Sequence, residues 1–184
     1  TKKRFLSSKS DAYTLKKGKY VYESADSSID SKNNANSKKR KVIGTISTKV
    51  KNLALEIVGD KTGHSALKAI VEWMDKNIWY KYYCGFCKSP DQVLNGKHGN
   101  CCDQTRLILQ LFDGAGLSEY YNLYYCDVPN HVYAIVTSKS TGTKTYIDPA
   151  SDYHTAYGYV CQGYQKGSPS SSYPKLPFNS CGGC

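Results

Sequence analysis

The stretch "KHGNCCDQTRLILQLFDGAGL", residues 97–117, places two adjacent cysteines directly before a helical pattern of apolar residues. Thr105, Ile108 and Phe112 continue the row that begins at Cys101, and Gly114 starts the glycine-containing segment that ends the helix. A thiol in the first turn of a helix lies near N–H groups without helical partners and near the positive end of the helix dipole, and both favour its thiolate. The stretch therefore predicts a helix that begins at a reactive cysteine.

Two further helices are predicted upstream. Apolar residues recur at helical spacing over residues 47–58, and "GDKTGH" (59–64) interrupts this pattern. The stretch "HSALKAIVEWMDKNIWY" (64–80) carries one apolar stripe that we expect to face the core, made of Leu67, Ile70, Val71, Met74 and Ile78. An extended segment and a turn-rich approach to the cysteines are expected after it.

The second half of the chain has the period of strands. The stretch "HVYAIVTS" (131–138) alternates between two faces, and "TYIDPA" (145–150) is a second short strand. Between them, "KSTG" (139–142) is typical of a hairpin loop. A separate strand is expected near "KYVYES" (19–24), and the tyrosines around residues 120–125 either line a groove or pack in the core.

A cysteine nucleophile needs a base that also protonates the leaving group, and a third group that orients this base. Cys101, His131 and Asp148 provide these residue types in chain order. If Thr137 pairs with Gly142, the register places His131 directly across from Asp148, and directly opposed residues share a face. Among the four histidines, His131 is the one that opens a strand whose partner carries an acid.

A plainer interpretation stays open at this point. Cys101 and Cys102 can also be buried thiols, and His131 a strand residue with satisfied hydrogen bonds. Adjacent residues of a helix point about 100° apart, so the two cysteines are not expected to share a catalytic role. Spacing alone does not decide between them.

Four ordered motifs carry a family resemblance: G-N-C-x-D-Q at 99–104, L-x-x-x-L-x-x-G along the helix, "HV" opening a strand and "YIDP" (146–149) closing the next. Over residues 47–150 the chain resembles the transglutaminase-like cysteine peptidase superfamily. More narrowly, "AIVEWMDKNIWYKYY" (69–83) followed by "GNCCDQTRLIL" is similar to pseudomurein endoisopeptidases of methanogen viruses and archaea. The stretch "GLSEY" (116–120) differs from the "GIPAR" common in the superfamily, so the resemblance does not describe the acceptor side.

The resemblance implies an α+β, papain-like core with the nucleophile helix packed on an antiparallel sheet. It also implies that Cys101 is the nucleophile, His131 the base and Asp148 the orienting acid, with Cys102 a bystander. Tyr80 and Gln104 are candidate donors to the oxyanion, although core packing of Tyr80 and a positioning role of Gln104 are the plainer alternatives.

The activity implied is hydrolysis of the isopeptide bond between alanine and the ε-amino group of lysine in pseudomurein, the peptide-crosslinked wall of certain methanogens. We expect a monomer that is made in the cytoplasm of a methanogen host, encoded by a virus or by the archaeon, and that acts on the cell wall. A transglutaminase-type transfer of the acyl group to an amine is the nearest alternative, because water and an amine can attack the same acyl-enzyme.

The remaining cysteines include two C-x-x-C units with internal glycine, Cys84 with Cys87 and Cys181 with Cys184. Such units resemble the knuckles of four-cysteine zinc sites, which predicts a structural zinc ion, with disulfides as the alternative. No cofactor is needed for the cysteine chemistry itself. Calcium binding through "DSSIDS" (26–31) is a weaker alternative.

The positive charge belongs to the front of the chain, which has 184 residues and a formal net charge of +10. Residues 1–50 contain 13 Lys and Arg against 4 acids, a net charge of +9. We expect a basic extension over 1–45 and a catalytic domain over 46–184. A non-catalytic module that binds a wall polymer is a further alternative, but no nucleic-acid recognition pattern accompanies the charges.

The sequence contains no apolar run long enough to span a membrane. Because the chain begins at Thr1 rather than at Met, we expect it to be a processed piece of a longer protein.

Overall fold

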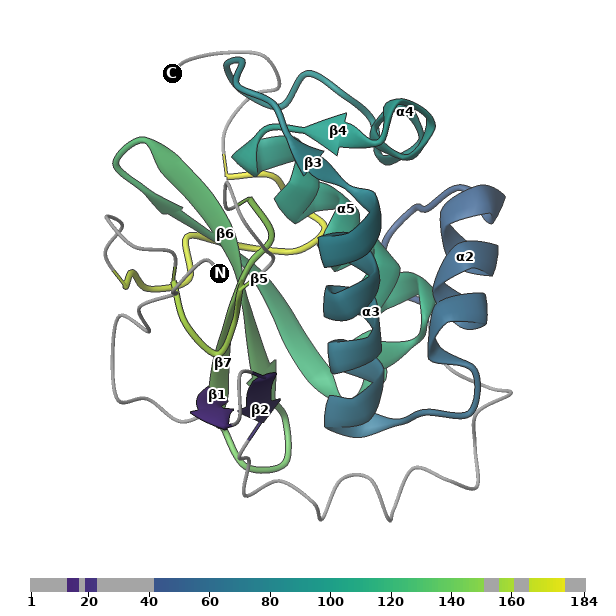
Figure 1. Ribbon diagram of the computed structural model, residues 1–184, viewed down its shortest axis with the longest axis vertical. Helices are drawn as coiled ribbons and strands as arrows, with labels where there is room; N and C mark the ends of the chain where they lie inside the picture. Colours follow the sequence, from purple (N-terminus) through teal and green to yellow (C-terminus); the bar gives the residue numbers. More distant parts are fainter. Residues whose placement is uncertain (1–12, 17–18, 23–41, 151–155, 161–165, 178–184) are drawn as a thin grey trace.

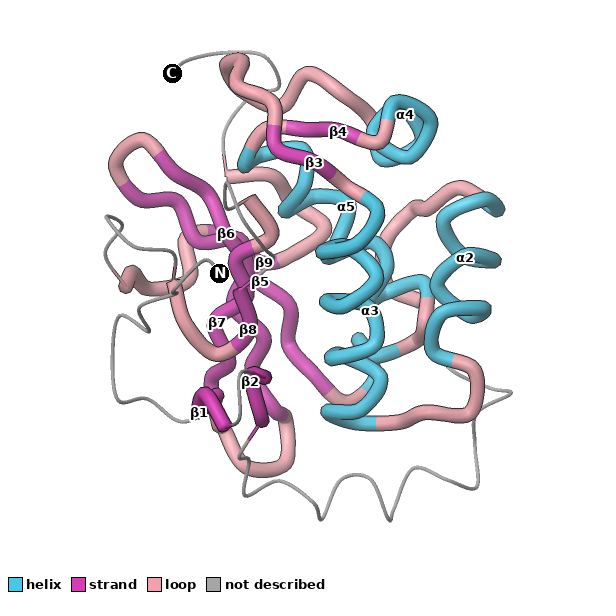
Figure 2. The backbone as a smooth tube through the Cα atoms, viewed as in Figure 1, coloured by secondary structure: helices cyan, strands magenta, loops and turns pink. Residues whose placement is uncertain are grey.

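A computed structural model describes residues 13–16, 19–22, 42–150, 156–160 and 166–177, with helices stacked on one side of an antiparallel sheet (Figure 1). The sheet has the strand order β8-β7-β6-β5-β9, and all neighbouring strands are antiparallel (Figure 2). Its strands are β5 (Tyr121–Val128), β6 (His131–Ser138), β7 (Lys144–Asp148), β8 (Ala156–Tyr157) and β9 (Ser171–Ser172). The architecture confirms the predicted α+β fold class with a helix packed on an antiparallel sheet.

The helices surround α5, which begins at the cysteine pair. They are α2 (Thr48–Val58), α3 (Gly63–Asn77), α4 (Pro90–Gly96), α5 (Cys101–Gly114) and the short 3₁₀ helix η1 (Leu117–Glu119). Helix α5 contacts α2, α3 and α4 as well as strand β6. It is therefore the central element of the core and not a surface helix.

Two hydrophobic clusters lie on the two faces of the sheet. Leu123, Val132 and Val136 belong to the main core, which they share with the helices. Residues of the opposite parity, such as Cys126 and Tyr133, form a smaller cluster that includes Val160. This alternation explains why the strands are apolar on both faces: one face is covered by α5 and the other by the chain after β7.

Two short strand pairs lie outside the main sheet. Strands β1 (Tyr13–Lys16) and β2 (Lys19–Tyr22) form an antiparallel pair, and β2 lies within the strand expected near residues 19–24. Strands β3 (Trp79–Tyr80) and β4 (His98–Gly99) pair in parallel directly before α5. The second pair joins the segment after α3 to the residues that lead into α5.

The three predicted helices are confirmed, and their ends have physical causes. Ser47 caps α2 by accepting a hydrogen bond from the Val50 N–H, and Gly59, with a φ of 51°, ends that helix. The predicted apolar stripe of α3 is buried throughout. Within α5, Ile108 and Phe112 are fully buried, as the row of apolar residues indicated.

Helix α4 and strand β5 are among the elements that were not predicted. Helix α4 replaces part of the expected turn-rich segment. Its sequence signal is a capping box, in which the side chains of Ser89 and Gln92 accept hydrogen bonds from each other's backbone N–H groups. Pro90 lies in the first turn, where a missing N–H costs no hydrogen bond. Strand β5 covers the tyrosines around residues 120–125, of which Tyr121 and Tyr125 are buried in the core and do not line a groove.

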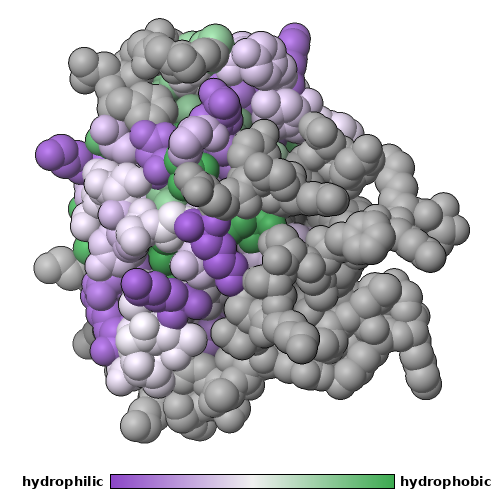
Figure 3. Space-filling view, turned by 90° about the vertical axis from the view of Figure 1, so that its left-hand side faces the viewer, coloured by the Kyte–Doolittle hydropathy of each residue, from purple (hydrophilic) through white to green (hydrophobic). Residues whose placement is uncertain are grey.

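The described part of the surface in Figure 3 is mostly hydrophilic, with small separate hydrophobic areas between the polar residues. Among the described residues, no helix is both long enough and apolar enough to cross a bilayer. Most of the proposed basic extension, over residues 1–45, lies outside the described residues, so its boundary stays a prediction.

Candidate active site

Cys101 is the first residue of α5, and Asn100 fixes its position. The Asn100 side-chain oxygen accepts a hydrogen bond from the Asp103 N–H at 2.9 Å. Its amide nitrogen donates to the carbonyl oxygens of Tyr83 and Gly85, at 2.8 Å and 2.7 Å. One buried side chain thus caps the helix and ties its first turn to the preceding loop, which holds the Cys101 backbone in place.

His131 is the first residue of β6 and follows a tight turn. Val128 and His131 are paired across the β5–β6 hairpin, and Asn130 between them has a φ of 62°, a conformation that asparagine tolerates better than most residues. The imidazole Nε2 lies 2.8 Å from Asp148 Oδ2, and both side chains are almost completely buried. A buried carboxylate this close fixes the orientation of the ring.

The predicted strand register is wrong by two residues. Strand β6 pairs with β7 so that Thr137 lies opposite Lys144 and Ala134 opposite Ile147. Asp148 is therefore a diagonal neighbour of His131 and not its direct partner. Because the side-chain period of a strand is two, the shift leaves both side chains on the same face and within contact.

Cys101 lies against the same imidazole. Its sulfur is hydrogen-bonded to the His131 side chain, to the Cys102 thiol and to the Val132 backbone N–H. Since Asp148 occupies Nε2, the ring nitrogen left for Cys101 is Nδ1. The structure thus brings Cys101, His131 and Asp148 into one continuous chain of contacts.

The protonation of this group is strongly perturbed. The hydrogen bond between Cys101 and Cys102 lowers the pKa of Cys101 most, burial opposes it, and the bond to His131 lowers it further, to about 4. Burial lowers the pKa of His131, but the bonds to Asp148 and Cys101 outweigh burial and raise this pKa to about 9. Between these values the stable form is a thiolate beside an imidazolium, which is the reactive form of a cysteine nucleophile.

Pro149 explains why the backbone N–H and carbonyl groups of Val132 can form hydrogen bonds with residues of α5. Continuing the β6–β7 register beyond Ala134 and Ile147 would place Val132 opposite Pro149, which has no N–H to donate. The Val132 N–H instead donates to the Cys101 sulfur, and the Val132 carbonyl accepts a hydrogen bond from Thr105 Oγ1 at 3.1 Å. The backbone groups of Val132, where the β6–β7 ladder ends, therefore hold α5 against the sheet. Sequence reasoning placed Thr105 on the buried row of the helix but missed its hydrogen bond, and it missed Val132.

The two candidate oxyanion donors differ in geometry. Gln104 is buried, and its amide nitrogen donates to the carbonyl oxygens of Trp79 at 3.1 Å and Gly99 at 2.8 Å. Both of its N–H groups are therefore engaged, which favours the positioning role: Gln104 joins α5 to β3 and β4. Tyr80 is half-buried on β3, and its role as a donor stays a prediction.

Backbone N–H groups are the better candidates. Among the described hydrogen bonds, the Asp103 and Gln104 N–H groups both donate to Asn100, whereas the N–H groups of Cys101 and Cys102 have no recorded acceptor. These two donors lie at the positive end of the α5 dipole, next to the sulfur.

The first C-x-x-C unit lies in the loop before the nucleophile helix. Cys84 is disulfide-bonded, and the exposed Cys87 donates its thiol hydrogen to the Cys84 carbonyl at 2.8 Å. A disulfide sulfur is not a thiolate ligand, so the predicted zinc site would need this bond to be reduced. Cys181, Cys184 and the "DSSIDS" stretch lie outside the described residues. Among the residues that the structure describes, no cluster of three or more potential metal ligands occurs.

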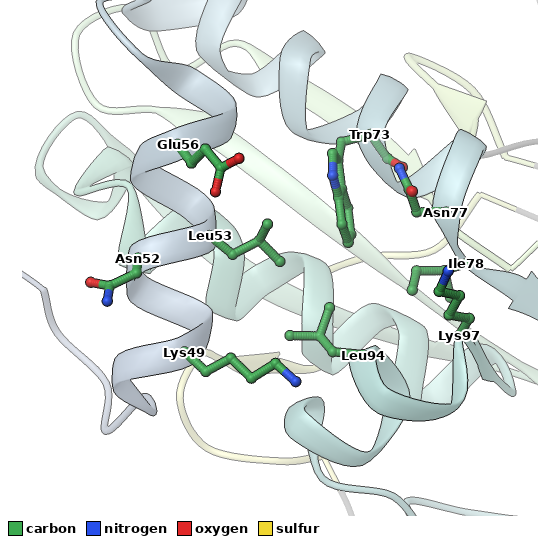
Figure 4. Close-up of a pocket in the computed structure, with 9 residues that line it drawn as sticks. All are labelled: Lys49, Asn52, Leu53, Glu56, Trp73, Asn77, Ile78, Leu94 and Lys97. Carbon is green, nitrogen blue, oxygen red and sulfur yellow. The ribbon is translucent and has the colours of Figure 1, made fainter.

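A cavity of about 440 Å³ lies among α2, α3 and α4 (Figure 4). Leu53, Trp73 and Leu94 face one another across it, and Lys49 and Glu56 are among its polar lining residues. It contains none of Cys101, His131 and Asp148, so it is separate from the candidate active site.

Comparison with known families agrees with this location. Residues 51–121 match the transglutaminase-like superfamily. The matched region runs from α2 to the start of β5 and includes Cys101 in its sequence context, but it ends before His131 and Asp148. This match points to an enzyme of the cysteine peptidase or transglutaminase type. No curated protein matches the chain, so the narrower resemblance to pseudomurein endoisopeptidases stays a prediction.

Proposed function

We propose that this protein is a cysteine endopeptidase that works through an acyl-enzyme on Cys101, with His131 as general acid and base and Asp148 as its orienting group. The observation that carries the proposal is the contact chain from the Cys101 sulfur through the His131 ring to the Asp148 carboxylate. Its thiolate–imidazolium form supplies a nucleophile and a proton donor at the same carbonyl.

The reaction would proceed in two stages. The Cys101 thiolate attacks the amide carbon, and the oxygen that becomes negative is stabilised by backbone N–H groups at the start of α5. The His131 imidazolium gives its proton to the departing amine, and the carbon–nitrogen bond breaks. Water then loses a proton to the neutral imidazole as it attacks the thioester, which releases the carboxylic acid and returns the sulfur as thiolate.

The substrate proposed is the isopeptide bond between alanine and the lysine ε-amino group of pseudomurein. It rests on the predicted resemblance of residues 69–83 and 99–109 to pseudomurein endoisopeptidases, which no curated match tests. On this proposal the protein is made in a methanogen host, from a viral or archaeal gene, and acts on the cell wall as a monomer.

Transfer of the acyl group to an amine is the second candidate, because the matched family is described as transglutaminase-like. The two candidates share the acyl-enzyme and differ in what attacks it. Hydrolysis releases free ε-amino groups, whereas transfer incorporates an added primary amine into the wall material.

The deciding experiment is digestion of purified pseudomurein sacculi under reducing conditions, followed by mass spectrometry of the released peptides. Wild type is compared with Cys101→Ala and with Cys126→Ala, a buried cysteine in the cluster on the other face of the sheet. We expect new lysine ε-amino groups with wild type and Cys126→Ala and none with Cys101→Ala. Amine incorporation without release would favour the transferase, and retained lysis by Cys101→Ala would favour a binding module.

A further inference from the structure

The second cysteine of the pair lies close enough to act on the first. The Cys101 and Cys102 sulfur atoms are 3.9 Å apart, within hydrogen-bonding range for two sulfurs. Cys102 is 4% exposed and lies in the main core, whereas Cys101 is half-buried and faces His131. Although adjacent helical residues point in different directions, the first turn of α5 brings these two sulfurs together.

The direction of the hydrogen bond follows from the charges around the pair. Cys101 lies beside the cationic His131 and receives the Val132 N–H, both of which favour its negative form. Cys102 is buried and is influenced by the carboxylates of Asp103 and Asp127, which disfavour a negative charge. Its own pKa is raised, first by the bond to Cys101 and then by burial. The proton between the two sulfurs therefore belongs to Cys102.

We propose that Cys102 is a positioning residue for the nucleophile, whose thiol donates a hydrogen bond to the Cys101 thiolate. This inference rests on the proposed function and assigns a role to a side chain that the sequence pattern treats as a bystander. Three donors then surround the sulfur: the Cys102 thiol, the His131 ring and the Val132 N–H. They hold it at the helix start, next to the backbone N–H groups that would bind the oxyanion.

The proposal predicts two opposite effects of removing the donor. Without the Cys102 thiol the Cys101 thiolate forms less readily, so reaction at low pH falls. The thiolate that does form is more nucleophilic, because nucleophilicity rises with pKa with a Brønsted slope of about 0.4–0.5. If the pKa of Cys101 rises by about one unit, the plateau rate at high pH therefore rises about threefold. Loss of packing alone would lower the rate at every pH.

Other ionisable groups near the two sulfurs contribute to the same pH profile. They are Asp103 on α5, Tyr125 and Asp127 on β5, and His131 on β6 with Asp148 behind it. The substitutions below leave all of them in place, so a shift of the acidic limb reports on Cys102.

The test is the rate of alkylation of Cys101 by iodoacetamide as a function of pH, on the full chain after reduction and removal of the reductant. Modification is followed by mass spectrometry of the tryptic peptide 98–106, whose fragment ions distinguish the two cysteines. The variants are Cys102→Ala and Cys102→Val, which remove the donor, and Cys102→Ser, which keeps one. Cys126→Ala is the matched control, because it removes a buried thiol that donates to the Ser168 carbonyl on the other face of the sheet.

We expect the acidic limb of both donor-free variants to move up by about one pH unit or more, with a higher plateau, so that the rate at a fixed pH on that limb falls about threefold for a shift of one unit. Cys102→Ser and Cys126→Ala should follow the wild-type limb. The proposal is overturned if either folded donor-free variant keeps the wild-type limb, or if Cys126→Ala moves it equally.

Failure of this inference can be distinguished from failure of the proposed function, since alkylation needs no substrate. A shifted limb without wall hydrolysis by wild type would refute the peptidase and leave the role of Cys102 standing. Hydrolysis that depends on Cys101, with an unshifted limb, would refute the role of Cys102 alone.

Discussion

Replacing Asp148 by asparagine tests the contact that holds the candidate base. Asp148 is completely buried, its Oδ2 lies 2.8 Å from His131 Nε2, and its Oδ1 accepts the Ala150 N–H at 3.2 Å. Asparagine has nearly the same shape and can keep one of these acceptors, but it has no charge. The substitution therefore removes the negative charge beside the ring with little change in packing.

The expected magnitude follows from the charge-assisted hydrogen bond. Such bonds contribute roughly 1.5–3 kcal/mol, which corresponds to about 1–2 pH units of stabilisation of the imidazolium. The His131 pKa, about 9 in the wild type, is therefore expected to fall to about 7–8. Because His131 must be protonated to donate to the leaving amine, the basic limb of kcat/KM moves down by the same amount. Turnover at the optimum falls on the order of 10²- to 10⁴-fold through loss of ring orientation.

The assay is the pH profile of amide hydrolysis, with the His131 ring titrated independently by NMR. In the wild type, activity is expected between a limb near pH 4, where Cys101 takes up a proton, and a limb near pH 9, where His131 loses one. Asp113→Asn is the control, because Asp113 is also completely buried but lies at the other end of α5. A basic limb that stays near pH 9 in Asp148→Asn would refute the assignment of Asp148 as the partner of His131.

Three further outcomes are expected. Asp113→Asn lowers the free energy of unfolding by about 1–3 kcal/mol in thermal or urea denaturation but leaves the pH profile unchanged, because its carboxylate accepts the N–H groups of Ile43 and Gly44 and the Ser118 hydroxyl. Thr105→Val leaves the buried Val132 carbonyl without its donor, so it lowers the free energy of unfolding by about 1–3 kcal/mol and lowers kcat. Thr137→Val removes a buried hydroxyl for which the described residues offer no hydrogen-bond partner, so its effect on stability is neutral or favourable. Equal losses of stability in the two variants would contradict this reasoning. If the C-x-x-C units bind zinc in the reduced protein, metal analysis gives about one equivalent of zinc, and a chelator lowers the melting temperature. Less than half an equivalent of zinc, with a melting temperature that a chelator does not change, would contradict the predicted zinc site.

The sequence predicted α5 well because its signals agree with one another. The apolar row and the terminal glycines both indicate the helix that the structure has over Cys101–Gly114, and tertiary packing reinforces that choice. Strand β5 was missed because its tyrosines are compatible with a surface groove as well as with a buried face. Only pairing with β6 through the two-residue turn at 129–130 decides between them, and pairing of this kind is not a local property.

The candidate site was predictable in its residue types but not in its backbone. His131 and Asp148 could be named because each chemical role requires one of few side chains, whereas the choice of Cys101 over Cys102 came from the family resemblance. The contributions of Asn100, Val132 and Thr105 could not be read from spacing, since they depend on which backbone groups lack partners once the sheet has formed. Gln104 illustrates the same limit: its type is suitable for an oxyanion donor, but the carbonyl oxygens of β3 and β4 occupy its N–H groups.

The register error shows that the contact between His131 and Asp148 depends on which face of its strand each residue occupies, and not on direct pairing of the two residues. A slip of one residue between β6 and β7 would turn Asp148 to the face opposite His131 and break the contact, whereas a slip of two keeps the face and changes a direct neighbour into a diagonal one. The diagonal arrangement has a further consequence, since it places Pro149 opposite Val132. Because proline cannot continue the ladder, the Val132 backbone remains available to Cys101 and Thr105. The Asp-Pro pair thus does two things at adjacent positions: Asp148 orients the His131 ring, and Pro149 leaves open the backbone groups that hold α5 beside it.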